Sequence, residues 1–104
     1  MKILKFRCQS VPAPHARDAV LCGVVGSGNL EVLMQAGGDH TYCCVDIHTS
    51  VRDFDQIWES VITSFAAAHQ LGGTHITIND MGATPAVVNL RLAQAFAQYN
   101  GVTQ

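Results

Sequence analysis

The spacing of apolar residues changes near residue 53, and that change limits the folds open to this chain. Before it, apolar side chains fall into short runs of strand character, several of them alternating with polar ones. After it, apolar residues recur three and four positions apart from Phe54 to Phe65, which predicts an amphipathic helix. Strands followed by a helix, a strand and a second helix predict an α+β fold, in which two helices pack on one face of a mainly antiparallel sheet of four to five strands.

The strands are expected at residues 3–8, 19–25, 30–35, 41–49 and 74–80. The first run alternates and could form an edge strand. The second run is apolar on both faces, which suggests a central strand covered at least partly on both sides. Alternation within the fourth run places Cys43, Val45 and Ile47 on one face, which we expect to point toward the helices.

Two helix starts can be read from the sequence. Asp53 with Gln56 three residues later resembles a capping box, and the glycines at 72–73 should end the helical region that follows. Thr84 before Pro85 predicts the start of the second helix, with the threonine as its cap. The apolar stripe of this helix is expected to consist of Val88, Leu92, Ala95, Phe96 and Tyr99.

Composition excludes several classes of function. The 104 residues make one domain, 1–104, with a formal net charge of -2 and only six Lys and Arg, so we expect no nucleic-acid binding. Lys5 and Arg7 interrupt the apolar start of the chain, and no apolar run approaches the ~20 residues of a membrane span, so we expect no membrane partner. The four cysteines do not resemble a disulfide framework, which favours a cytoplasmic protein.

No catalytic or metal-binding set can be assembled from the sequence. His40, Cys43, Cys44 and His48 have ligand side chains, but strand alternation points Cys43 away from the others, so we expect no metal site. The motif His15-Ala16-Arg17 is similar to the active site of the histidine-containing phosphocarrier of sugar phosphotransferase systems. In that carrier a helix follows the motif, whereas a strand-like run follows here, so a His15 phosphoryl carrier remains only a third interpretation.

Gly26-Ser27-Gly28 lies between two expected strands and has two interpretations. Glycine-rich tips are ordinary hairpin turns, and the chain would then be a small α/β interaction module without a covalent cofactor. Alternatively, the Ser27 hydroxyl is a site that another protein modifies, because its neighbours have no side chains. Ser27 is not the nucleophile of a hydrolase elbow, since a strand rather than a helix follows it.

Two stretches resemble the signatures of a known family. Residues 23–33, GVVGSGNLEVL, resemble one signature of the acyl carrier (delta) subunit of bacterial malonate decarboxylase, and residues 80–88, DMGATPAVV, followed by RLAQA at 91–95, resemble the other. The two occur in the expected order, and the chain length fits. Asn29 departs from the pattern, in which an aspartate is expected.

The resemblance implies that Ser27, flanked by Gly26, Gly28 and Asn29, carries a covalent prosthetic group, 2'-(5''-phosphoribosyl)-3'-dephospho-CoA, through a phosphodiester. The terminal thiol of this group would hold acetyl and malonyl groups as thioesters. The implied partners are a malonyl/acetyl transferase subunit, the decarboxylase subunits and the prosthetic-group transferase that modifies Ser27. The chain itself would be a non-catalytic carrier.

The order of the elements also predicts what lies near Ser27. If the strands alternate in direction and the helix from residue 53 returns the chain, the strand 74–80 runs parallel to 41–49. The turn after residue 80 and the start of the second helix then lie at the same end of the sheet as Ser27. Because helix N-termini attract anions, one hypothesis is that the segment from Gly82 to Thr84 helps hold the phosphate or ribose of the group on Ser27, and the alternative is that Thr84 only caps its helix.

Overall fold

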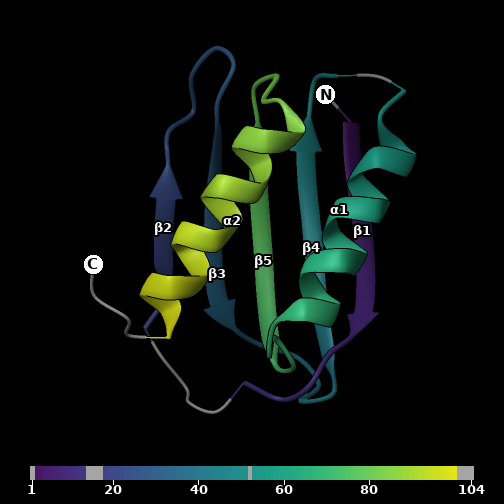
Figure 1. Cartoon of the computed structure of the whole chain (residues 1–104), viewed down its shortest axis with the longest axis vertical. Coiled ribbons are helices and arrows are strands. Elements are labelled where there is room, and N and C mark those ends of the chain that lie inside the picture. The colour runs from purple at the N-terminus through teal and green to yellow at the C-terminus, as the bar shows by residue number, and fades with distance from the viewer. Residues whose placement is uncertain (1, 14–17, 52, 101–104) are drawn as a thin grey trace.

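The computed structural model describes residues 2–13, 18–51 and 53–100, so the His15 motif lies outside the described residues. Two helices cover one face of a five-stranded sheet and leave the other face open, which confirms the expected α+β fold (Figure 1). The strands are β1 (Lys2–Gln9), β2 (Val20–Gly23), β3 (Leu30–Ala36), β4 (Tyr42–Thr49) and β5 (Thr74–Asp80). The helices are α1 (Asp55–Ala68) and α2 (Pro85–Tyr99).

The strands are arranged in the order β1-β4-β5-β3-β2. Neighbouring strands are antiparallel except for β4 and β5, which are parallel and joined through α1. The predicted parallel direction of these two strands is therefore confirmed. As a consequence, the β2–β3 turn and the β5–α2 turn lie at the same end of the sheet, which is the upper end in Figure 1.

A strand is present within residues 19–25, but its expected length and its expected central position in the sheet were wrong. Only Val20–Gly23 form a strand, and this strand is an edge of the sheet rather than its centre. Cys22 is buried beneath α2, whereas Leu21 points to the open face and is 59% exposed. The apolar run was interpreted as burial on both faces, but apolar side chains are also common on protein surfaces, so their presence alone does not place a strand at the centre.

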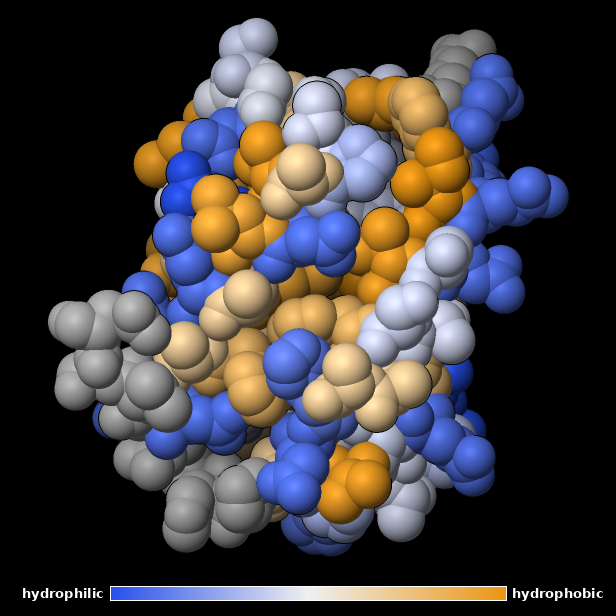
Figure 2. Space-filling view, in the orientation of Figure 1, coloured by the Kyte–Doolittle hydropathy of each residue, from blue (hydrophilic) through white to orange (hydrophobic). Residues whose placement is uncertain are grey.

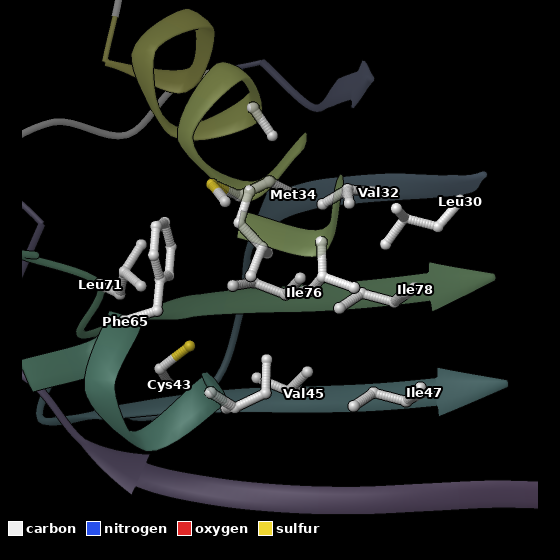
Figure 3. Packing of buried hydrophobic residues seen from close by; sticks show 14 of the residues in the cluster. Leu30, Val32, Met34, Cys43, Val45, Ile47, Phe65, Leu71, Ile76 and Ile78 are labelled. Carbon is white, nitrogen blue, oxygen red and sulfur yellow. The ribbon is translucent and has the colours of Figure 1, made fainter. Parts of the chain in front are cut away.

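The core fills the space between the sheet and the helices (Figure 3). Cys43, Val45 and Ile47 all point into it, as the alternation of β4 predicted. The stripe of α2 is confirmed as well, since its core-facing residues are buried or half-buried. On α1, Trp58, Ile62 and Phe65 are buried, but Ile57 in its first turn and Phe54 just before the helix remain 42% and 44% exposed.

The two helix starts differ from each other. Thr84 caps α2 as predicted, because its hydroxyl accepts a hydrogen bond of 3.3 Å from the Val87 N–H. The prediction of a capping box formed by Asp53 and Gln56 was wrong, because α1 begins at Asp55 and its N-cap, Phe54, makes no side-chain capping bond. Asp53 has a φ of 66°, in the left-handed region, so it belongs to the turn that precedes the helix.

Cys43 and Cys44 offer a direct test of the strand faces. Burial raises the pKa of the Cys43 thiol to about 12, whereas Cys44 lies half-buried on the opposite face of β4. Because the thiolate is the reactive form, we expect iodoacetamide at pH 8 to alkylate Cys43 at least about a hundredfold more slowly than Cys44. Tandem mass spectrometry separates the two, unfolding in urea should equalise them, and equal rates in the native protein would contradict the assignment.

Neither helix in the described part of the chain has the length and apolar character needed to cross a membrane.

Candidate functional site

Ser27 occupies the tip of the hairpin that joins β2 to β3. The Asn29 N–H donates to the Gly26 carbonyl at 2.9 Å and closes a turn with Ser27 and Gly28 at its centre. Gly28 has a φ of 73° while Ser27 stays outside the left-handed region, the combination of a type II turn, which favours glycine at its third position. Ser27 is exposed, so the turn presents its hydroxyl to solvent.

The tip is attached to the turn that follows β5. The Gly28 N–H donates to the Met81 carbonyl at 2.9 Å, and the Met81 N–H donates to the Asn29 carbonyl at 3.0 Å. These bonds continue the β3–β5 pairing beyond its last strand pair, Leu30 with Asp80. Ser27 is therefore one residue from a backbone bond to Met81, and the loop 81–84 that contains Gly82 and Thr84 lies at the same end of the sheet.

A buried carboxylate holds the loop 81–84 in place. Asp80 is buried, and one of its oxygens accepts from the Thr49 hydroxyl at 2.9 Å while the other accepts from the Ala83 N–H at 2.9 Å. Gly82 has a φ of 88°, and a Cβ at this position would meet no atom within 4 Å. The loop is thus fixed at its base and open to solvent above Gly82.

Arg91 reaches the hairpin from α2, a contact that the sequence did not predict. Its Nε donates to the Asn29 side-chain oxygen at 3.2 Å, and its Nη1 donates to the Gln94 side-chain oxygen at 2.9 Å. Both acceptors are neutral amides, and no ion pair in the described ranges includes Arg91. The aspartate expected at position 29 would have neutralised this guanidinium, whereas asparagine leaves its charge available two residues from Ser27.

Apolar residues surround the tip on the β2 side. Leu21, Val24 and Val25 are each more than half exposed. Gly23 below them has a φ of 88°, and a Cβ there would collide with the Leu30 carbonyl oxygen, so this position requires glycine. The hairpin therefore combines a tightly fixed base with an exposed apolar tip.

The ligand-type residues on β4 do not gather into a metal site. Within residues 2–13, 18–51 and 53–100, no three His, Cys, Asp or Glu side chains are placed to hold one ion. On the open face, His75 Nε2 lies 3.0 Å from an Asp46 carboxylate oxygen.

Comparison with known proteins identifies the family. The family model described as malonate decarboxylase delta subunit (MdcD) matches residues 17–99. The malonate decarboxylase acyl carrier protein of Acinetobacter calcoaceticus is 50% identical over 97% of this chain and 99% of its own, and that of Burkholderia cepacia is 51% identical over 94% and 90%.

A solved structure agrees with these sequence matches. The fold is similar to a chain in the crystal structure of a Pseudomonas malonate decarboxylase hetero-tetramer in complex with malonate, with a TM-score of 0.84 and 34% identity over 95% of this chain and 99% of that one. The family model and the relatives agree along almost the whole length. The chain belongs to the malonate decarboxylase delta subunit family, whose members named here are acyl carrier proteins.

Proposed function

We propose that this chain is the acyl carrier subunit of a malonate decarboxylase and that Ser27 is the attachment site of its phosphoribosyl-dephospho-CoA group. The observation that carries the proposal is the exposed Ser27 hydroxyl at a glycine-flanked tip fixed to its neighbouring loop, in a chain of the delta subunit family. The chain is a carrier rather than a catalytic subunit, and residues 1–104 act as one acyl-carrier domain.

The residues at the tip fit a phosphodiester. A Cβ at Gly28 would meet no atom within 4 Å, so a phosphate on Ser27 has space on that side. Arg91 supplies a nearby positive charge, whereas at the start of α2 Pro85 has no N–H and the Val87 N–H already donates to the Thr84 hydroxyl. Gly26, Gly28 and Asn29 shape the turn, and Gly82 and Thr84 are the proposed contacts of the phosphate or ribose.

When bound, the group supplies a thiol that holds acetyl and malonyl groups as thioesters. The protein's share is presentation, because a tethered thiol reaches the transferase and decarboxylase subunits at a higher effective concentration than a freely diffusing one. The exposed Leu21, Val24 and Val25 give those partners, and the prosthetic-group transferase, an apolar surface beside Ser27. No nucleic acid or membrane takes part, and the four free cysteines suit the cytoplasm.

Intact mass tests the proposal. The chain is produced with and without the family's prosthetic-group transferase and the precursor of the group. We expect one added mass equal to the phosphoribosyl-dephospho-CoA unit only when both are present, and fragment ions of the tryptic peptide 18–52 should place it on Ser27. An unchanged mass would support a plain hairpin instead, and an addition on another residue would overturn the site.

A further inference from the structure

An apolar pocket of about 240 Å³ opens between α1 and α2 at the end of the sheet that holds Ser27. Phe54, Ile57 and Val61 of the α1 side face Pro85 and Val88 of α2 across it. Figure 2 shows apolar surface gathered around this upper part of the space between the helices. Apart from Asp80, no charged residue of the described ranges lines the pocket, and Asp80 is buried and hydrogen-bonded.

The loop 81–84 connects the pocket to the hairpin that carries Ser27. Gly82, Ala83 and Thr84 line the pocket, and the residue before them, Met81, is hydrogen-bonded to both Gly28 and Asn29. β3 and β5 are adjacent strands, about 5 Å apart, and the end of β5 lines the pocket through Asp80. A CoA-derived group on Ser27 is longer than the spacing of the two strands, so its thiol end can reach the pocket of the molecule to which it is attached.

The size and lining of the pocket select what can enter. Its volume is below the roughly 300–1,000 Å³ of pockets that take whole ligands, so it suits the short thiol end of the group and not the nucleotide. The pocket also excludes phosphates, because an apolar lining cannot replace the hydration of an anion. Phe54 and Ile57 stay exposed at the rim, where an apolar occupant would cover them.

On the basis of the proposed function, the geometry points to a resting site: the pocket between α1 and α2 holds the thiol end of the chain's own prosthetic group when that end is free or acetylated. The malonyl form has a carboxylate, which the apolar lining disfavours, so its end stays outside the pocket. The carrier therefore presents the malonyl thioester to its partner subunits and shelters the acetyl thioester.

The test compares backbone amide NMR spectra of the apo-protein and of holo-protein with a free thiol, an acetyl thioester or a malonyl thioester. Intact mass first establishes attachment, and an unchanged mass would refute the proposed function itself. In attached protein, we expect shifts at Ile57, Val61 and Val88 in the free and acetyl forms but not in the malonyl form. If the shifts were confined to the hairpin and residues 81–84 in every form, the thiol end would not bind in the pocket and the proposal would be wrong. If the pocket residues shifted equally in all forms, the proposed exclusion of the malonyl form would be wrong.

Filling the pocket provides a second readout. Ala83 is half-buried in the wall, and its N–H bond to Asp80 does not involve its side chain, so Ala83→Leu should fold and occupy the space. We expect N-ethylmaleimide to alkylate the free thiol of the group roughly two- to tenfold faster in holo-Ala83→Leu than in wild type, given the millimolar effective concentration that a tether supplies. Leu90→Ala, on the exposed side of α2, is the control and should leave the rate unchanged. Equal rates in folded Ala83→Leu and wild type would contradict the proposal.

Discussion

Replacing Ser27 by alanine is expected to abolish the addition of the prosthetic group completely while leaving the fold intact. Ser27 supplies the only oxygen at the tip that can form the ester, because Gly26 and Gly28 have no side chains. Its side chain is exposed at a turn position that alanine also adopts, so the free energy of unfolding should change by less than about 0.5 kcal/mol. Intact mass after production with the prosthetic-group transferase measures the first effect, and thermal unfolding measures the second.

Ser50 provides a matched control for this experiment. It is also exposed and follows β4 at the same end of the sheet, but its neighbours are Thr49 and Val51 rather than glycines. Ser50→Ala should therefore gain the full mass of the group. If Ser27→Ala were still modified, or if Ser50→Ala lost the modification, the assignment of Ser27 would be wrong.

Replacing Leu92 by alanine is expected to lower the free energy of unfolding strongly. Leu92 is 0% exposed and packs in the core between α2 and the sheet. Removing three carbons from such a site costs about 2–5 kcal/mol through lost burial and the cavity that remains. At roughly 4 °C per kcal/mol, the Tm should fall by at least about 8 °C, as measured by circular dichroism.

Leu90 lies two residues away on the same helix and controls for helix propensity. It is 52% exposed, and leucine and alanine are both good helix formers, so Leu90→Ala should change the free energy of unfolding by less than about 0.5 kcal/mol. A similar loss in both variants would mean that α2 is not seated on the sheet as described.

The candidate site could be located from the sequence, but its surroundings could not. Ser27 stands out because glycines flank it between two strand-like runs, and the direction of the strands placed Gly82 and Thr84 at its end of the sheet. The contact of Arg91 with the hairpin could not be predicted, because no sequence pattern links a residue of the second helix to Asn29, 62 residues earlier. The pocket between the helices was also unseen, because its walls come from segments far apart in the chain.

The sequence by itself determined the element types, the inward face of β4 and the cap of α2, because hydrophobic period and local side-chain bonds act within a few residues. Only the tertiary structure decided the strand order, which makes the apolar Val20–Gly23 an edge and seats β5 between β3 and β4. That order depends on which surfaces bury the most area together, a property of the whole chain. It brings Ser27, the loop 81–84 and Arg91 to one corner of the molecule, where the proposed carrier function resides.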